Sequence, residues 1–223
     1  MTDSNRDAAA ASGQPAKPKP AFADPAGTWN QRYSADGFLF GREPNAWLAE
    51  HAEVWQAGQR VLCVADGEGR NSVHLASLGL QVDAFDISEV AVAKARKFAG
   101  DRGVTVNFGI ADCDSHDWQP ESCDGIAAIF VQFADPPLRT RLFSHMRQAL
   151  KPGGTLVLQG YTPRQLDYRT GGPPCASHLY TEALLRQALA GMDIVELREY
   201  EADLAEGSGH HGRSALIGVV ARK

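Results

Sequence analysis

The chain has 223 residues, of which 43% are hydrophobic, and a formal net charge of −5 at pH 7. This length suits one domain of ordinary size with a full core. The acidic balance excludes dependence on a broad basic surface for nucleic acid, and no apolar run is long enough to span a membrane.

The first 28 residues differ in composition from the rest. They contain eight alanines and four prolines but no leucine, isoleucine or valine. A segment with so little apolar surface to bury cannot offset the entropy lost on ordering. We therefore predict a disordered tail over residues 1–28 and one folded domain over residues 29–223.

The four cysteines indicate reduced thiols. They lie 50, 10 and 52 positions apart, a spacing that fits neither a zinc site nor a disulfide-rich scaffold, and no signal-peptide pattern precedes them. The cluster Asp112, Asp114, His116 and Asp117 lacks the glycine and the distant glutamate of a calcium loop, which predicts a solvated turn. We expect a cytoplasmic protein without a metal site.

The remaining chain alternates strand-like and helical stretches. Strands are predicted at 60–64, 82–87, 104–110, 124–133, 155–159, 194–200 and 216–221. Helices are predicted at 44–55 with Pro44 in the first turn, at 71–80, after the cap Ser88, after 136–137 and over 181–190. This order predicts an α/β fold: a Rossmann-like, mostly parallel seven-stranded sheet with helices on both faces and an antiparallel C-terminal strand pair.

A glycine turn over residues 65–69 follows the first predicted strand, and Asp86 ends the second strand 17 residues after Gly69. Ligands of open α/β sheets bind beyond the carboxyl ends of the strands, where glycine lets the backbone approach closely. A carboxylate at the end of the second strand can accept both ribose hydroxyls of a nucleoside. The pattern favours nucleoside binding over an ordinary strand–helix connection.

The run 61–72, VLCVADGEGRNS, resembles the first motif of class I S-adenosylmethionine-dependent methyltransferases, especially the branch with tellurite-resistance and thiopurine methyltransferases. Segments 82–88, 110–113, 124–133 and 151–154 resemble later motifs of the same family. The resemblance covers residues 29–223 and implies S-adenosyl-L-methionine as cofactor. Two positions depart from the family pattern: Cys63 replaces an acidic residue, and Ala65 replaces glycine and is expected to adopt a negative φ.

The resemblance also implies a set of cofactor-binding residues. The methionine portion would lie along Ala65, Asp66, Gly67, Glu68, Gly69 and Asn71, the ribose at Asp86, the adenine at Ile87, Ser88, Asp112 and Cys113, and the sulfonium at Phe130. Segment 29–45 resembles the family's N-terminal lid, with Tyr33 and Phe40 facing the sulfonium; alternatively, these rings only cover the sheet edge.

Substrate contacts are expected from the loop 159–173 and from segment 206–213. The candidate catalytic residues are Tyr161, Arg169, His210 and His211, with Arg42 and Arg213 adding charge at the mouth of the site. These groups favour a small acceptor, namely a thiol, a chalcogen oxyanion or another small anion, and neither nucleic acid nor a membrane as partner. A solvated glycine hairpin is the alternative for segment 206–213.

Two other functions stay open on the sequence. The run 67–72 approximates the G-x-G-x-x-G/A pattern of an NAD-dependent oxidoreductase. Cys63 and Ala65 are also compatible with a non-catalytic protein that retains the cofactor fold. No oligomeric state is predicted.

Overall fold

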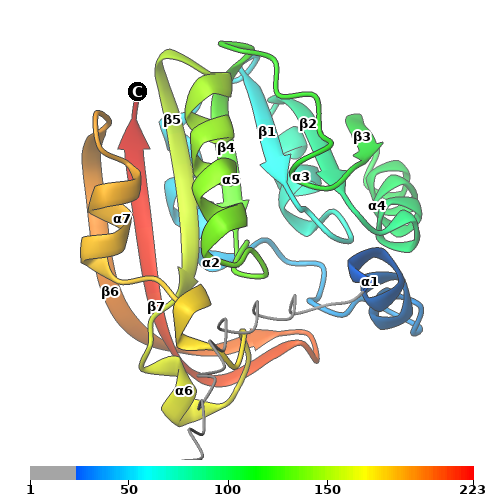
Figure 1. Cartoon of the computed structure of the whole chain (residues 1–223). Coiled ribbons are helices and arrows are strands. Elements are labelled where there is room, and N and C mark those ends of the chain that lie inside the picture. Colours follow the sequence, from blue (N-terminus) through cyan, green and yellow to red (C-terminus); the bar gives the residue numbers. More distant parts are fainter. Residues whose placement is uncertain (1–23) are drawn as a thin grey trace, which may run out of the picture.

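The computed structural model describes residues 24–223, in which seven strands form a single sheet flanked by helices (Figure 1). Along the chain the elements are α1 (Pro25–Tyr33), α2 (Ala46–His51), β1 (Arg60–Val64), α3 (Arg70–Ser77), β2 (Gln81–Asp86), α4 (Glu89–Asp101), β3 (Val106–Ile110), β4 (Cys123–Ile129), α5 (Pro136–Ala149), β5 (Leu150–Tyr161), α6 (Gln165–Tyr168), α7 (Glu182–Ala188), β6 (Asp193–Glu206) and β7 (His210–Arg222), with short 3₁₀ helices at Ala52–Val54 and Ala176–His178.

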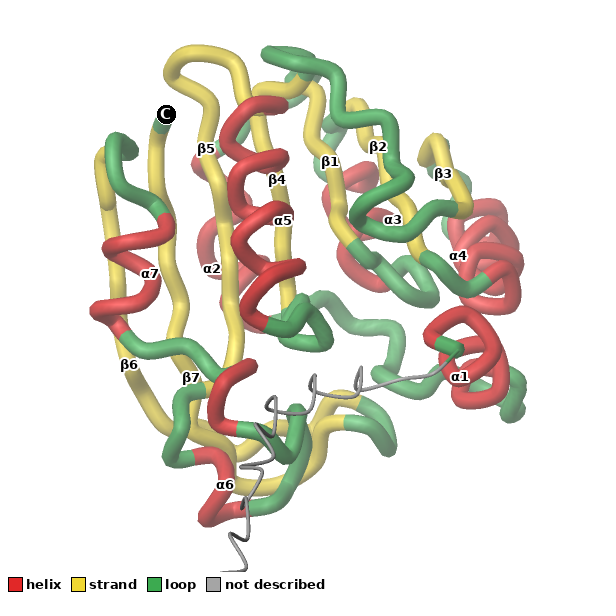
Figure 2. Tube along the Cα trace, viewed as in Figure 1, coloured by secondary structure: helices red, strands yellow, loops and turns green. Residues whose placement is uncertain are grey.

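The strand order is β3-β2-β1-β4-β5-β7-β6. The first five strands in this order, from β3 through β2, β1 and β4 to β5, pair in parallel. Strand β7 pairs antiparallel with both β5 and β6 (Figure 2). The predicted fold class is thereby confirmed. The order reverses between β1 and β4, and this switch point is where open α/β sheets bind their ligands.

Alternation along β1 explains why helices cover both faces of the sheet. Val61 and Cys63 point into a core shared with α2 and α3, whereas Leu62 and Val64 point into a core shared with α5 and α7. Figure 1 shows α5 and α7 in front of the sheet and α2 and α3 behind it. A strand buried on both faces reads as a continuous apolar run, which is what residues 61–64 show.

The first helix begins before the predicted domain boundary at Trp29. Asp24 caps α1 by accepting a hydrogen bond from the N–H of Gly27 at 2.9 Å, and Pro25 occupies the first turn. Residues 25–28 are therefore helical, and the expected disorder of residues 1–23 lies outside the described part of the chain. The second helix begins later than predicted, because Asn45 rather than a preceding residue caps it through the N–H of Leu48.

The C-terminal hairpin is longer than predicted. Strands β6 and β7 have 14 and 13 residues and are joined by a tight turn at Gly207, whose φ is 61°. Cross-strand pairing continues to Glu206 and His210, so segment 206–213 is not an open loop. Figure 1 shows this end of the hairpin curving beneath the carboxyl ends of the parallel strands, on the side where α1 lies.

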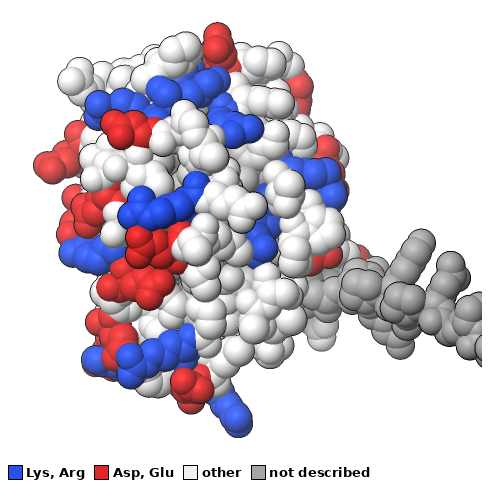
Figure 3. All heavy atoms as spheres, turned by 60° about the vertical axis from the view of Figure 1, so that its left-hand side comes forward, with Lys and Arg blue, Asp and Glu red and all other residues white. Residues whose placement is uncertain are grey.

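Charges of both signs are interspersed on the face that carries β6 and β7 (Figure 3). Ion pairs on the hairpin and on α7 include Arg213 with Glu201 at 2.7 Å and Arg186 with Glu182 at 2.7 Å. Among residues 24–223, no helix is long and apolar enough to cross a membrane.

Candidate active site

Asp66 organises the turn that follows β1. Its carboxylate accepts hydrogen bonds from the N–H and the hydroxyl of Ser72, in the first turn of α3. Burial raises the pKa of Asp66 to about 7, although both bonds from Ser72 oppose the shift. Cys63, at the position where the resembling family has an acid, instead packs into the core beside α2 and α3. The carboxylate that holds this turn thus comes from Asp66.

The expectation of a negative φ at Ala65 is wrong. Ala65 adopts φ 49°, in the same left-handed region as Gly67 at 62° and Gly69 at 89°. The chain must leave β1 and enter α3 within a few residues, and this tight reversal imposes the left-handed conformation on the alanine. For a residue with a side chain, that conformation costs about 1–2 kcal/mol.

Asp86 joins the end of β2 to the same turn. One carboxylate oxygen accepts the N–H of Gly67 at 2.9 Å, and the other accepts the N–H of Ser88 at 2.8 Å. The residue is 6% exposed, and burial raises its pKa although these backbone N–H bonds oppose the shift. A carboxylate has about four acceptor sites, and the N–H groups of Gly67, Ser88 and Ile87 engage three of them. Asp86 is therefore held in place with free acceptor capacity, as a group that binds ribose hydroxyls requires.

The N-terminal segment 25–45, which contains the predicted lid 29–45 and is called the lid below, lies over this turn. A Cβ placed on Gly67 would stand 2.7 Å from the hydroxyl of Tyr33, so only glycine lets this ring approach so closely. Tyr33 stacks on Trp29 and meets the edge of Phe40 at centroid distances of 5.5 and 6.2 Å. The predicted aromatic residues are thus brought to the carboxyl end of the sheet.

Polar contacts fasten the lid to α3 and α4. Glu68 accepts hydrogen bonds from the N–H of Leu39 at 2.7 Å and from Nζ of Lys94 at 3.0 Å. Asn71 accepts the N–H of Asn45 at 3.0 Å. The side chains of Glu68 and Asn71, predicted to bind cofactor, thus also hold the lid.

The residues expected around the adenine occupy the ends of β2 and β3. Ser88 caps α4 through the N–H of Ala91, and half-buried Ile87 precedes it. Asp112 is exposed and closes its own turn by accepting the N–H groups of residues 114 and 115 at 2.8 and 2.7 Å. Cys113 is buried, which raises the pKa of its thiol to about 12. These residues follow β2 and β3 at the same end of the sheet as Asp86, and their contact with an adenine stays a prediction.

The four predicted catalytic residues do not form one cluster. Tyr161 and His210 lie together, with ring centroids 5.7 Å apart and Phe130 against both at 4.7 and 4.4 Å. His211, the neighbour of His210 on β7, is exposed on the opposite face of the hairpin because side chains alternate along a strand. Arg169 is exposed on the loop after α6.

The expected cationic mouth is also not assembled. Arg213 is exposed and pairs with Glu201 at 2.7 Å, and Arg42 lies over the ring of Phe38 at 4.6 Å. The cation at the centre of the site is Arg70, which donates to the carbonyl of Phe40 at 3.2 Å. Arg70 lies in the glycine motif of residues 61–72, but its hydrogen-bond partners, Phe40 and Glu206, lie outside that motif.

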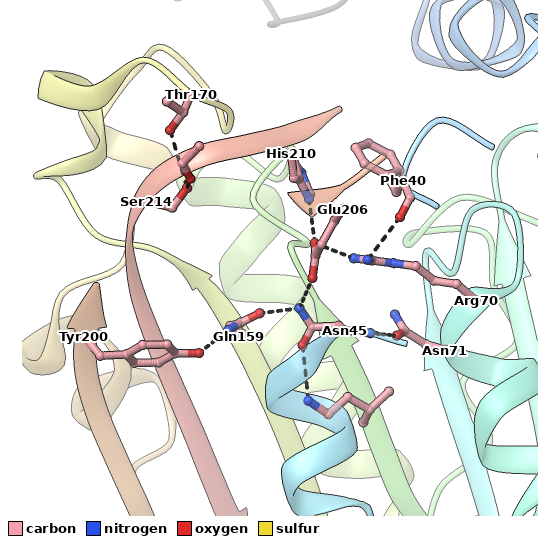
Figure 4. A network of polar contacts seen from close by, with 12 residues as sticks. Phe40, Asn45, Arg70, Asn71, Gln159, Thr170, Tyr200, Glu206, His210 and Ser214 are labelled. Atoms are coloured by element: carbon pink, nitrogen blue, oxygen red, sulfur yellow. Dashed lines mark hydrogen bonds and ion pairs between the residues drawn. The ribbon is translucent and has the colours of Figure 1, made fainter. Parts of the chain in front are cut away.

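A buried polar network connects the lid to the hairpin (Figure 4). Glu206 accepts hydrogen bonds from Arg70 at 2.9 Å, from Nδ2 of Asn45 at 3.0 Å and from Nδ1 of His210 at 3.1 Å. Nδ2 of Asn45 also donates to Gln159 at 2.6 Å. Sequence reasoning missed Glu206, although an acid four residues before a histidine across a glycine turn is the signal that could have shown it.

The hydrogen bonds and charges of this network change the pKa of Glu206. Burial alone would raise it, but the bond from His210 and the charge of Arg70 lower it to about 2. Burial lowers the pKa of His210 despite the nearby carboxylate. At neutral pH the site therefore holds a carboxylate beside a neutral imidazole.

The sheet order, the glycine turn after β1 and the buried acid at the end of β2 define a Rossmann-like domain of the methyltransferase type. A family model described as a methyltransferase domain matches residues 61–154. The ubiquinone biosynthesis O-methyltransferase of Xanthomonas campestris pv. campestris is 30% identical over 169 residues, which cover 71% of this chain and 68% of that protein. The chain belongs to the class I S-adenosylmethionine-dependent methyltransferase family, which confirms the resemblance and favours it over an NAD-dependent oxidoreductase.

Other relatives share smaller parts of the chain. Thiocyanate methyltransferase 1 of Arabidopsis thaliana is 31% identical over 117 residues, which are 52% of this chain and 50% of that protein. The chain spans only 15% of the biotin biosynthesis bifunctional protein BioHC of Teredinibacter turnerae, at 36% identity over 39% of its own length.

Solved structures share the fold. A SAM-dependent methyltransferase from Methanosarcina mazei superposes with a TM-score of 0.66 at 20% identity, covering 81% of this chain and 98% of that chain. TehB from Haemophilus influenzae gives a TM-score of 0.66 at 17% identity, covering 89% of this chain and 66% of that chain.

Proposed function

We propose that this chain transfers a methyl group from S-adenosylmethionine to a small molecule. The observation that carries the proposal is the position of Asp86, buried at the end of β2 and fixed to the backbone of Gly67 at 2.9 Å. When bound, the cofactor supplies a methyl group activated by its sulfonium. Asp86 would accept the ribose hydroxyls, and the turn 65–69 would pass along the methionine portion.

The lid would exclude water from the reacting groups. Tyr33 and Phe40 already lie at the carboxyl end of the sheet, and an aromatic face attracts a cationic sulfonium. Methyl transfer is an in-line displacement, so positioning and exclusion of water supply most of what the protein must add. Residues Ile87, Ser88, Asp112 and Cys113 remain our candidates for the adenine.

The acceptor would bind where Phe130, Tyr161 and His210 meet. These residues come from the end of β4, the end of β5 and the hairpin, so the acceptor would be enclosed by three elements and the lid. The relatives are named for methylation of oxygen, in ubiquinone biosynthesis, and of thiocyanate, which supports a small acceptor with an oxygen or sulfur nucleophile. The formal net charge of −5 supports a small molecule rather than nucleic acid.

We also propose a cytoplasmic location. Cys63, Cys113 and Cys123 are buried free thiols, and Cys175 is an exposed free thiol. Thiols persist in reducing compartments.

Titration calorimetry with S-adenosylhomocysteine and, separately, with NAD tests the cofactor. We expect binding of the adenosyl ligand only, and a loss of affinity of about 10-fold to 100-fold in Asp86→Asn from weakened ribose hydrogen bonds. The matched control is Asp83→Asn on the same strand, whose side chain pairs with Arg60 on the protein surface. Binding of NAD alone, or equal affinity in wild type and Asp86→Asn, would contradict the proposal.

A screen of acceptors separates an enzyme from a non-catalytic cofactor-binding protein. Thiols, phenols, selenite, tellurite and small carboxylates are incubated with S-adenosylmethionine, and release of S-adenosylhomocysteine is measured. Turnover of at least one small acceptor is expected. Cofactor binding without turnover of any acceptor would favour the non-catalytic alternative.

A further inference from the structure

His210 lies at the first position of β7, directly after the hairpin turn. Its ring is enclosed by the rings of Phe40 at 4.5 Å, Phe130 at 4.4 Å and Tyr161 at 5.7 Å between centroids. Only 8% of the residue is exposed. The lid, the end of β4 and the end of β5 thus converge on this imidazole.

Glu206 determines which nitrogen of this ring carries the proton. Its Oε2 lies 3.1 Å from Nδ1 of His210, and a carboxylate can only accept, so Nδ1 carries the hydrogen (Figure 4). Neutral imidazole then presents a lone pair at Nε2, which has no hydrogen-bond partner among residues 24–223. Arg70 and Asn45 hold the carboxylate from the other side at 2.9 and 3.0 Å, so the pair is rigidly oriented.

The charged and titratable groups that face His210 come from four elements. Glu206 on β6 raises the pKa of His210, Arg70 on α3 and Arg32 on α1 lower it, and burial among the aromatic rings is the largest influence and also lowers it. Tyr161 on β5 faces it as a neutral phenol, because burial raises the pKa of that hydroxyl. The imidazole is therefore unprotonated at neutral pH, as a base must be.

Tyr161 supplies an independent sign that a polar group binds here. The residue is 1% exposed, and its hydroxyl has no hydrogen-bond partner among the described residues. Buried hydroxyls are normally paired, so an unpaired one beside His210 indicates a site for a polar ligand atom. A Cβ on Gly171 would stand 2.9 Å from this hydroxyl, so the loop after α6 closes the same space.

We propose that His210, oriented by Glu206, is the base that removes a proton from the acceptor, and that the acceptor is therefore a small phenol, alcohol or thiol that arrives protonated. This inference rests on the proposed function. The acceptor's O–H or S–H bond breaks as its proton moves to Nε2 of His210. The freed electron pair forms the bond to the methyl carbon, and the carbon–sulfur bond of the donor breaks with its electrons remaining on sulfur. Glu206 stabilises the resulting imidazolium until the proton leaves to water.

The charges of the site favour a protonated acceptor over an anion. Glu206 is itself an anion at the centre of the site, and its charge neutralises Arg70. Arg169 and His211 are exposed and Arg213 is paired with Glu201, so the cationic cluster expected from the sequence does not face this space. An oxyanion would meet the carboxylate of Glu206, while Arg32, the other cation that influences His210, is exposed and lies over the ring of Trp29 at 4.4 Å.

The first test compares acceptors that differ in acidity. Rates of S-adenosylhomocysteine release are measured with alkyl thiols, phenols and alcohols, which are protonated at pH 7, and with strongly acidic thiophenols, which are already ionised. In His210→Gln we expect a loss of about 100-fold or more with the protonated acceptors and little loss with the ionised ones. With protonated acceptors, the rate of the variant should rise with pH and recover with added imidazole. The control is His74→Gln on α3, outside this cluster.

The second test needs no acceptor. Nitrogen NMR of the histidine-labelled chain should show the Nδ1–H tautomer for His210 and a pKa below the ordinary value, both altered in Glu206→Gln. An Nε2–H tautomer would overturn the inference, and so would a loss in His210→Gln that is equal for protonated and ionised acceptors. If the wild type binds S-adenosylhomocysteine but methylates none of these phenols, alcohols or thiols, the acceptor class is wrong; if it binds no adenosyl ligand, the proposed function itself fails.

Discussion

Arg70 and Glu206 are 136 positions apart in the sequence, yet Nη2 of Arg70 lies 2.9 Å from Oε2 of Glu206. Their side chains are 8% and 12% exposed, so neither charge is compensated by bulk water. Arg70 opens α3 beside the glycine turn, and Glu206 ends β6. This pair therefore connects the predicted cofactor site to the hairpin that carries His210.

Removing either partner should destabilise the protein strongly. We expect Arg70→Met and Glu206→Gln each to lower the free energy of unfolding by about 3–5 kcal/mol, because each leaves a buried group without its partner. The double variant should lose much less than the sum. Urea unfolding in a double-mutant cycle measures this coupling, with the exposed pair Arg213 and Glu201 as control. A coupling no larger than in the control pair would contradict the assignment.

The left-handed backbone of Ala65 predicts a stabilising substitution. Ala65→Gly removes the clash of Cβ at φ 49°, while it adds entropy to the unfolded chain. We expect a net increase of about 0.5–1 kcal/mol in the free energy of unfolding. Ala76→Gly in α3 is the matched control and should decrease it by about 1 kcal/mol. Equal destabilisation by both substitutions would show that Ala65 is not strained.

Asp66 predicts how stability depends on pH. Its folded-state pKa of about 7 lies above the ordinary value of 3.8, so the folded state binds a proton that the unfolded state releases between these values. The contribution of Asp66 to stability should therefore fall as pH rises from about 4 to about 7. Asp66→Asn keeps the shape without the charge, so it should gain stability relative to wild type over this range. Chemical unfolding at several pH values measures the difference, and a difference that stays constant with pH would refute the prediction.

The hydrogen bond between Asn30 of α1 and Ser88, the cap of α4, is expected to stabilise the closed position of the lid. The hydroxyl of Ser88 donates to Oδ1 of Asn30 at 2.7 Å. In Asn30→Ala this bond is lost, and opening of the lid should become easier by about 0.5–1.5 kcal/mol. Amide exchange of α1 should then accelerate about 2-fold to 10-fold, and adenosyl ligands should associate faster. Gln31→Ala, on the exposed face of the same helix, should leave both rates unchanged; equal acceleration in both variants would exclude this contact as the fastener.

The sequence alone determined the sheet, the glycine turn after β1 and the acid at the end of β2. The apolar run 61–64, the glycine turn and Asp86 are local patterns, because strand alternation and turn conformation depend on residues a few positions apart. Such patterns predicted the fold class, and they placed Asp86 at the carboxyl end of β2, where the structure has it. Because β2 is a parallel strand of the sheet, its last residue must lie at the carboxyl edge of the sheet.

Only the tertiary structure decided which polar groups meet. His210 and His211 are adjacent and of the same residue type, so the sequence does not show which one is buried. The register of the hairpin decides this: His210 points into the candidate site and His211 points to solvent. Glu206 becomes a buried anion because the curved hairpin carries it to Arg70 and Asn45, which belong to other elements. No local pattern encodes these approaches, since they depend on how far the hairpin extends and bends beneath the sheet. The contacts among His210, Glu206 and Arg70 are therefore a product of chain packing over long sequence separations.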